Sequence, residues 1–389
     1  MQGITDQRLS RRAFLAATAS ASLLAACGQT PAASAPSTSA PSTSASGSGG
    51  WQTQWDSWIA GAKKEGKLVL ASGPSPEARV KVPEAFKKAF GIDVDYLGGA
   101  TSDLANRLRS EQAANQFTVD VAVAGADTAY LVLYGEHLTE PIKPHLINPE
   151  ATNPAAWKNG KVWYMDPEQQ SIVRASSYLS RPLAFNTDYV KTSEVKAWHD
   201  LLNPRYKGKI ASYDPAKNGS GGQTSAYLYN VLGADFVKGL YVDQGTAVTG
   251  DYRQLSDWLA RGLYPIALAM RGEDIDKLQN DKFKVEAIGS LADAAGYVSA
   301  GFGLVNLLKN PPHPNAAKLF LNWILMKDGQ IAWNSSQKTV SIRTDVDNAW
   351  ADPSIVPKAG VEYFDTYSAE YTSTGYATAN KAVKALLGQ

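Results

Sequence analysis

Short apolar runs alternate with segments of helical periodicity in the first half of the sequence. The runs at 67–71, 92–96 and 119–123 predict strands, because each is brief and ends near glycine. After the first run, Ser75 precedes a proline, which is typical of a helix start, and Gly91 suits the end of that helix. Strand, helix, strand, helix and strand with short connections predict a parallel sheet covered by helices.

The same alternation returns in the second half of the sequence. Apolar runs at 209–212, 264–270 and 297–308 predict further strands. One helix is expected over 224–232, and another over 314–328, where apolar residues recur on one face. Each half of the chain therefore predicts an open α/β sheet.

The first 26 residues predict an export signal. Arginines at 8, 11 and 12 precede an apolar stretch that is too short and too rich in alanine and serine to span a bilayer as a helix. Residues 10–15, Ser-Arg-Arg-Ala-Phe-Leu, resemble a twin-arginine export motif. The alternative is an ordinary signal that happens to carry adjacent arginines.

A lipid attachment site is expected directly after this signal. Residues 24–27, Leu-Ala-Ala-Cys, resemble a bacterial lipobox, in which the cysteine receives a diacylglyceryl group. Residues 28–50 consist of Ser, Thr, Ala, Pro, Gly and a single Gln, a composition that cannot bury a core. We therefore expect 27–50 to be a lipidated Cys27 followed by a disordered tether. The alternative is a chance buried cysteine.

Composition and charge exclude several classes of protein. Lys and Arg number 38 against 37 Asp and Glu, so binding to nucleic acid through bulk positive charge is not expected. One Cys and four His exclude a disulfide framework and disfavour a metal cage built from those residues. The serine-hydrolase, zinc-protease and P-loop motifs do not occur, which disfavours an enzyme, and no cofactor is expected.

Small polar residues follow the predicted strands, at the edge where open α/β sheets bind ligands. In the first half they are Ser72, Gly73, Ser75, Thr101, Ser102 and Asp127; in the second half they are Ser220, Gly221, Gly222, Gln223, Thr224 and Arg271. Backbone N–H groups at helix starts, with hydroxyls beside them, favour anions. For each Ser or Thr the alternative is a plain helix N-cap.

Five segments, taken in order, carry a resemblance to a known family. They are 83–94, 120–123, 185–188, 203–210 and 310–318. Across roughly residues 66–345 the chain resembles the extracytoplasmic solute-binding proteins of ABC importers, in the branch that includes the ferric-iron binding proteins. The resemblance implies a type II periplasmic-binding-protein fold, in which two α/β lobes joined by hinge strands close on one ligand and deliver it to a membrane permease.

The resemblance also implies a domain organisation. Lobe 1 is expected over 51–182 with 293–340 returning to it, lobe 2 over 183–292, and a C-terminal segment, 341–389, packing on the lobes. Tyr178, near the first hinge strand, joins the candidate ligand-binding residues. The protein is expected to be a monomer on the periplasmic or outer face of a membrane, held there only by its lipid.

One departure from the family bears on the solute. The iron binders carry adjacent tyrosines after the strand that matches 264–270, whereas this chain has Arg271, Glu273 and Asp274 there. A fixed cation at Arg271 favours a small organic anion such as a carboxylate or phosphate ester. One alternative is that Arg271 is a surface residue paired to its acidic neighbours. A second is that Glu273 and Asp274 are oxygen ligands of ferric iron or another metal. A third is that the protein is a secreted lipoprotein enzyme.

Overall fold

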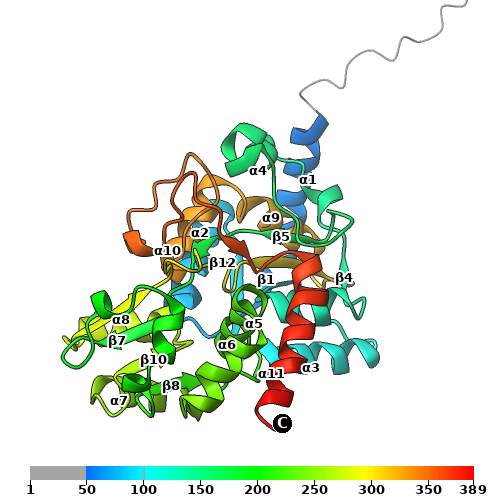
Figure 1. Ribbon diagram of the computed structural model, residues 1–389. Coiled ribbons are helices and arrows are strands. Elements are labelled where there is room, and N and C mark those ends of the chain that lie inside the picture. The colour runs from blue at the N-terminus through cyan, green and yellow to red at the C-terminus, as the bar shows by residue number, and fades with distance from the viewer. Residues whose placement is uncertain (1–49, 100) are drawn as a thin grey trace, which may run out of the picture. The chain divides into compact units, whose positions relative to one another are not determined.

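The structure, a computed structural model, describes residues 50–99 and 101–389 as a mixed α/β protein (Figure 1). The export signal, Cys27 and all but the last residue of the expected tether lie outside the described residues. In the part of the chain that the structure describes, no helix combines the length and apolar character needed to cross a membrane.

The first sheet has a parallel half and an antiparallel half. Its strand order is β2-β1-β3-β13-β4, with β5 also paired to β13. Strands β1 and β2 and strands β1 and β3 pair in parallel, whereas β13 is antiparallel to β3, β4 and β5. The strands are β1 Lys67–Ser72, β2 Asp93–Gly98, β3 Val121–Ala124, β4 Thr139–Glu140, β5 Ile172–Arg174 and β13 Leu304–Leu308. The helices that accompany them are α1 Gly50–Glu65, α2 Pro76–Phe90, α3 Thr101–Ala113, α4 Pro149–Thr152, α9 Pro314–Trp323 and α10 Lys327–Gln337.

The second sheet has the order β11-β7-β10-β8-β9. Strands β8, β9 and β10 run parallel, and β7 is antiparallel to both β10 and β11. The strands are β7 Leu183–Asn186, β8 Ile210–Tyr213, β9 Ala247–Thr249, β10 Ile266–Leu268 and β11 Val285–Ile288. The accompanying helices are α5 Ser220–Leu232, α6 Ala234–Lys238, α7 Tyr252–Ala260 and α8 Gly272–Asn280.

A small third sheet lies where the chain passes between the other two. Strand β6 (Tyr178–Leu179) precedes β7, strand β12 (Tyr297–Ser299) follows β11, and the two pair in an antiparallel manner. Strand β14 (Phe364–Asp365) pairs in parallel with β12. Both crossings between the two large sheets therefore run side by side.

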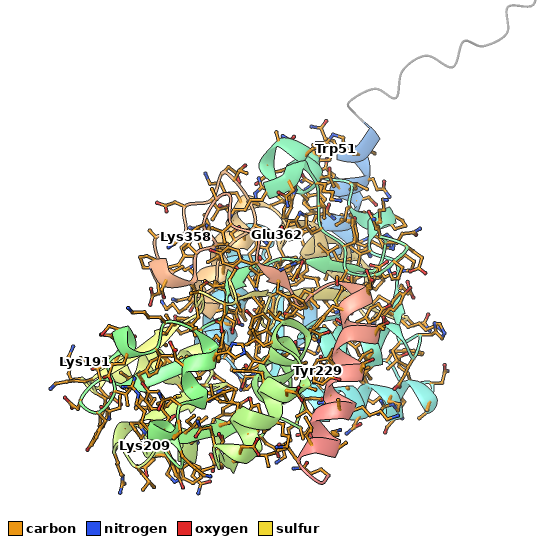
Figure 2. The ribbon with its side chains drawn as sticks, viewed as in Figure 1. Trp51, Lys191, Lys209, Tyr229, Lys358 and Glu362 are labelled. Carbon is orange, nitrogen blue, oxygen red and sulfur yellow. The ribbon has the colours of Figure 1, made fainter. Side chains whose placement is uncertain are left out.

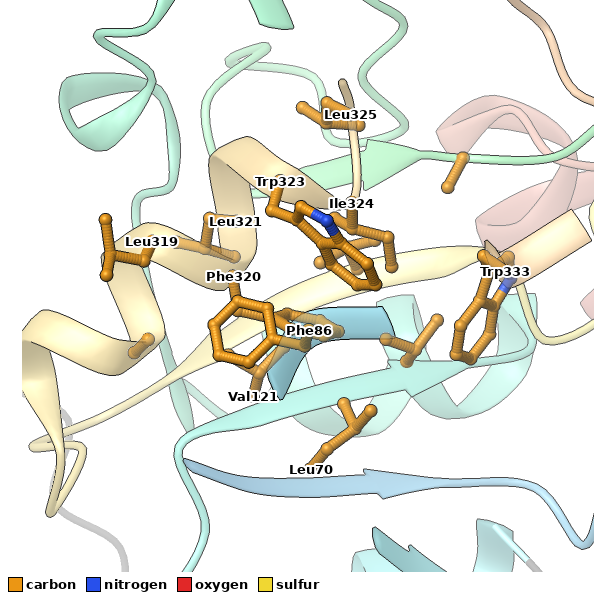
Figure 3. Packing of buried hydrophobic residues seen from close by; sticks show 14 of the residues in the cluster. Leu70, Phe86, Val121, Leu319, Phe320, Leu321, Trp323, Ile324, Leu325 and Trp333 are labelled. Carbon is orange, nitrogen blue, oxygen red and sulfur yellow. The ribbon is translucent and has the colours of Figure 1, made fainter. Parts of the chain in front are cut away.

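Each large sheet has its own apolar core. In the first, Phe86 of α2 packs against Phe320 and Trp323 of α9, with ring centroids 5.5 and 5.3 Å apart (Figure 3). The second core contains Phe185 of β7 and Tyr227 of α5. Burial of apolar surface at about 25 cal/mol per Å² is the main stabilising contribution in both cores.

The C-terminal segment adds two elements to the second core. These are the π-helix η10 (Tyr371–Tyr376) and the helix α11 (Ala377–Leu386), whose Val383 is fully buried in that core. Tyr229 of α5 lies beside α11 (Figure 2). Two other π-helices are η1 Asp127–Tyr134 and η8 Gly239–Asp243, and short 3₁₀ helices are η2 Lys143–His145, η3 Pro154–Ala156, η4 Lys158–Gly160, η5 Thr192–Glu194, η6 Trp198–Leu202, η7 Pro204–Tyr206 and η9 Pro353–Ile355.

Three of the expected elements have different bounds. Helix α5 begins at Ser220 rather than at Thr224, because Gly219, with a φ of 103°, turns the chain directly into the helix. The expected strand 297–308 is two strands, β12 and β13, separated by a turn in which Gly301 has a positive φ. The expected helix 314–328 ends at Trp323, and α10 begins at Lys327.

Candidate functional site

The two serines at the end of β1 are held in structural contacts. The buried Ser72 hydroxyl donates to the carbonyl of Val123 in the neighbouring strand, at 2.7 Å. The Ser75 hydroxyl accepts the N–H of Ala78 at 3.2 Å and thereby caps α2. Both hydroxyls therefore have roles that need no ligand, and for Ser75 the structure shows the N-cap alternative.

Gly73 makes a close packing contact. A Cβ atom there would lie 2.6 Å from the ring of Phe302, so a larger residue would force that ring to move. The carbonyl of Gly73 accepts the Tyr96 hydroxyl at 3.1 Å. Thr101 and Ser102 form the first turn of α3, where only their backbone is described. Their predicted roles in ligand binding stay predictions.

The start of α5 is tied to the end of β10. The Ser220 hydroxyl donates to the carbonyl of Ala269 at 2.5 Å and lies 2.9 Å from the Tyr252 hydroxyl. Ala269 has a φ of +61°, a left-handed conformation that is uncommon for a residue with a side chain. Ser220 therefore holds the β8–α5 connection against the β10–α8 connection.

The glycines at 221 and 222 pack against the preceding loop. A Cβ at Gly221 would lie 2.1 Å from the carbonyl oxygen of Asp214, and one at Gly222 would lie 2.6 Å from that of Lys217. The N–H of Gly222 donates to the Lys217 carbonyl at 2.9 Å. The expectation that this N–H is free for an anion was wrong, because the loop carbonyl already accepts it.

Arg271 is neutralised by the first turn of its own helix. Its guanidinium makes a bidentate contact with Asp274, at 2.7 and 2.8 Å, and a further ion pair with Glu273 at 2.7 Å. It also lies over the ring of Tyr252, with 4.4 Å from Cζ to the centroid. The contacts therefore match the alternative in which Arg271 pairs with its acidic neighbours rather than with a solute. Among the described residues no group of three or more His, Cys, Asp or Glu side chains could hold a metal ion.

Asp127 is the meeting point of three elements that are distant in sequence. It begins η1 just after β3, and its Oδ1 accepts the side-chain N–H of Gln223 from α5 at 3.0 Å. The hydroxyl of Tyr376, at the end of η10, is also hydrogen-bonded to the Asp127 carboxyl. The same hydroxyl lies 3.1 Å from Oδ1 of Asn218, so its single proton has two acceptors within reach.

The surroundings of Asp127 disfavour its ionised form. Burial raises the pKa of Asp127 to about 6, although the hydrogen bonds from Tyr376 and Gln223 act in the opposite direction. Burial also raises the pKa of Tyr371 and of Tyr367, and the negative charge of Asp127 adds to both shifts. At neutral pH the centre therefore carries a carboxylate among protonated tyrosines.

The crossing strands add further hydroxyls beside this centre. The Tyr297 hydroxyl of β12 lies 3.1 Å from that of Thr224, and Ser299 lies 3.3 Å from the Tyr367 hydroxyl. Burial raises the pKa of Tyr178 in β6, with a hydrogen bond to Ser299 opposing the shift. We call the combined group the Asp127 cluster: Asp127, Tyr178, Gln223, Thr224, Tyr297, Ser299, Tyr367, Tyr371 and Tyr376.

Two buried oxygen atoms of the Asp127 cluster lack a hydrogen-bond partner within the described chain. They are Oε1 of Gln223 and the hydroxyl of Tyr371, whose side chain is only 7% exposed. Buried polar atoms are nearly always paired, so each such atom needs an explanation. A bound molecule is one explanation that the position between the two sheets supports.

The structure thus divides the predicted residues into two groups. It brings Asp127, Tyr178, Gln223 and Thr224 into one cluster, whereas the other described residues of the set face packing contacts or, for Arg271, acidic neighbours. Sequence reasoning missed the tyrosines at 297, 367, 371 and 376. Four tyrosines between 363 and 376 were the available signal, although strand β14 interrupts the segment and they do not share one helix.

Comparison with known proteins identifies a family of solute-binding proteins and one sequence relative. The family model described as "bacterial extracellular solute-binding protein" matches residues 81–358. An uncharacterized protein of Haemophilus influenzae is 28% identical over 292 residues, which cover 70% of this chain and 77% of the relative.

Two solved structures illustrate the likeness of fold. Iron-bound HitA from Pseudomonas aeruginosa has a TM-score of 0.62 at 18% identity, covering 82% of this chain and 99% of its own. AfuA from Actinobacillus pleuropneumoniae, with exogenous fructose-6-phosphate bound, has a TM-score of 0.58 at 19% identity, covering 83% of this chain and 96% of its own. At these identities the likeness shows the fold, and the two titles name different ligands.

Proposed function

This chain belongs to the family of bacterial extracellular solute-binding proteins, and we propose that the solute it captures for its ABC importer is bound at the Asp127 cluster. The observation that carries this proposal is the contact between Asp127 and Gln223, which joins an element of the first sheet to one of the second. A solute that contacts both would favour the conformation in which the two sheets approach each other. The expected hinge is the pair of crossing strands, β6 and β12.

The polar atoms of the cluster favour a solute that donates hydrogen bonds. The Asp127 carboxylate and the unpaired Oε1 of Gln223 are both acceptors. The arginine predicted to attract an anion, Arg271, is already held by two carboxylates. A phosphate or carboxylate group would place negative charge against Asp127 without a free cation to offset it. Hydroxyl or ammonium groups would satisfy both acceptors.

A metal cation is the second candidate. The cluster offers oxygen atoms only, from a carboxylate, an amide and several tyrosines, and hard cations such as ferric iron prefer oxygen ligands. The likeness of fold to iron-bound HitA is consistent with this candidate. A metal would have to displace phenolic protons whose pKa values are raised by burial.

The test is a defined set of probes added to the purified protein, followed by thermal unfolding and calorimetry. Glucose and glycerol represent polyols, putrescine represents amines, ferric citrate supplies the metal, and inorganic phosphate represents anions. We expect saturable binding of a polyol or the amine and none of phosphate. Binding of ferric citrate alone would support the second candidate, and binding of phosphate alone would overturn the proposal. Recovery of the probe unchanged would distinguish binding from turnover.

We further propose that a lipid at Cys27 holds the protein at a membrane. The support is the Leu-Ala-Ala-Cys sequence followed by the uncharged segment 28–50. Cys27→Ser should move the protein from the membrane fraction to the soluble fraction after a salt wash. A Ser46→Ala variant in the same segment is the matched control. Retention of Cys27→Ser in the membrane fraction would contradict lipid anchoring.

A further inference from the structure

The C-terminal segment beyond strand β14 is anchored on the helices of the second sheet. Tyr371, Tyr376 and Ala379 form an apolar cluster with Ala226 of α5. The ring of Tyr371 packs edge-on against Phe364, with centroids 5.1 Å apart. Since the family model matches only residues 81–358, this segment lies outside the region that defines the family.

The same segment reaches the first sheet's side of the Asp127 cluster. Helix η10 contacts η1, which begins with Asp127. The Tyr376 hydroxyl lies within hydrogen-bond reach of Asp127 and of Asn218, so it touches elements that follow strands of both large sheets. A Cβ at Gly222 would lie 2.7 Å from this hydroxyl, which shows how closely Tyr376 approaches the start of α5.

We propose that the C-terminal segment forms a third wall of the solute site, in which the Tyr371 hydroxyl binds the solute directly and Tyr376 positions Asp127. This inference rests on the proposed function, because it assigns a further contact at the same site. The Tyr371 hydroxyl is buried and unpartnered, and the Asp127 charge contributes to its raised pKa. Leaving a buried hydroxyl unpaired costs free energy, which a solute that pairs with it would recover.

The Tyr371 hydroxyl also narrows the class of solute. A phenol O–H needs an acceptor for its proton, whereas Gln223 and Asp127 need donors. An ammonium group or a bare metal ion would leave the phenol proton unpaired. A phosphate would place negative charge against Asp127 and offer no donor to the unpaired Oε1 of Gln223. A hydroxyl group both donates and accepts, so the three polar groups together select a hydroxylated solute.

Tyr376 acts through Asp127. Its hydrogen bond opposes the effect of burial on the Asp127 carboxyl, so Tyr376→Phe should raise the pKa of Asp127 further above about 6. Carbon-13 NMR of the Asp127 carboxyl would measure this shift in the absence of solute. A packing role alone would leave that pKa unchanged.

The binding test uses Tyr371→Phe, which removes one oxygen atom and keeps the ring. With the tightest-binding polyol of the set above, we expect affinity about 3- to 10-fold weaker. The melting temperature without solute should not fall, because the substitution removes a buried hydroxyl that has no partner in the described chain. The control is Tyr206→Phe, which removes a buried hydroxyl of the second core that faces Arg205. Tyr206→Phe should bind the polyol as the unaltered protein does. Asp127→Asn, measured in parallel, tests the proposed site itself.

The outcomes separate the two proposals. Weaker binding by both Asp127→Asn and Tyr371→Phe supports the third wall. Weaker binding by Asp127→Asn with unaltered binding by Tyr371→Phe overturns it and leaves the proposed function standing. A lower melting temperature of Tyr371→Phe without solute would show a structural role for the hydroxyl and also overturn it. Unaltered binding by both variants would contradict both proposals. Binding of putrescine but of no polyol by the unaltered protein would overturn the third wall and leave the proposed function standing.

Discussion

Arg271 and Asp127 both follow strands that end at the edge where solutes bind, yet their surroundings differ. Arg271 is satisfied locally, by Glu273 and Asp274 in the first turn of α8. Asp127 is satisfied by Gln223, 96 positions later, and by Tyr376 still farther along the chain. The comparison teaches that a charge near a strand end marks a site only when its neighbours in sequence leave it unpaired.

The side chains of the two regions also differ in their exposure to solvent. The Arg271 side chain is 37% exposed and that of Glu273 57% exposed, so solvent screens their interaction. Asp127 lies among tyrosines that are nearly buried, and burial raises its pKa to about 6. A charge in such surroundings interacts more strongly with a bound solute than an exposed pair does.

The largest expected difference between the two regions is in solute affinity. Asp127→Asn removes the charge and keeps the shape of the side chain. A hydrogen bond to a charged group contributes about 1.5–3 kcal/mol, so polyol binding should weaken about 10- to 150-fold. Isothermal calorimetry measures this directly, with Glu273→Gln as the matched loss of a carboxylate. Equal affinity of Asp127→Asn and the unaltered protein would remove Asp127 from the site.

The position of Gln223 depends on the close packing at the start of α5. Gly221→Ala would place a methyl group 2.1 Å from the Asp214 carbonyl oxygen, which forces the helix start to move. We expect the free energy of unfolding to fall by about 1–3 kcal/mol, measured by urea denaturation. Gly125→Ala is the control, since its nearest neighbour would be the Gly301 carbonyl at 3.7 Å. Equal stability of the two variants would show that α5 has room to shift.

The pH dependence of binding should follow Asp127. A hydroxyl that donates to Asp127 favours the carboxylate, so affinity should rise about tenfold from pH 5 to pH 7, through the pKa of about 6. Gln223 does not titrate, and burial keeps Tyr367, Tyr371 and Tyr376 protonated over this range. Asp127→Asn should give a flat profile in calorimetry at several pH values. A profile that falls with pH would contradict the role of the carboxylate.

Without solute, the stabilisation that Asp127 contributes to folding should fall as pH rises, in contrast to the solute affinity. Since the folded pKa of Asp127 lies above its ordinary value of 3.8, the folded state favours the protonated form. The resulting stabilisation is complete below that ordinary value and is lost as pH rises through about 6. The difference in unfolding free energy between the unaltered protein and Asp127→Asn, measured across pH 4–7, isolates this contribution.

Substitution of Arg271 should have the smallest effects on stability and on solute affinity. The Arg271–Glu273 pair is exposed and the Arg271–Asp274 pair is partly buried, so Arg271→Ala should lower the free energy of unfolding by about 1 kcal/mol. We expect polyol affinity to change by less than about threefold. A tenfold or greater loss of affinity for inorganic phosphate in Arg271→Ala, with partial recovery in Arg271→Lys, would instead restore the anion site that the sequence suggested.

Much of the secondary structure could be predicted because its signals are local. The apolar runs at 67–71 and 209–212 form β1 and β8, and Ser75 caps α2 as its proline neighbour indicates. The start of α5 could not be placed from the pattern, because it depends on contacts of Gly221 with a loop carbonyl. The break between β12 and β13 depends on the chain leaving one sheet for another.

The candidate site was only partly accessible to sequence reasoning. The rule that ligands bind beyond strand ends selected Asp127, Gln223 and Thr224, which do meet in one cluster. The same rule also selected Ser72 and Ser220, whose hydroxyls are bonded to backbone carbonyls. The position of a residue at a strand end follows from the local sequence. Whether its hydroxyl is already hydrogen-bonded depends on which carbonyl groups of neighbouring segments lie beside it.

The sequence by itself determined the alternation of strand and helix, the capping of α2 and the edge of each sheet at which polar residues gather. These follow from apolar periodicity and from the conformational preferences of proline, glycine and serine, which act over a few residues. The acidic partners of Arg271 also lie within three residues of it, at 273 and 274. Only the tertiary structure decided that Gln223 and Tyr371 keep unpaired oxygen atoms. The reason is that hydrogen-bond partners are assigned by packing, which brings α5, η1 and the C-terminal segment together over long separations in sequence.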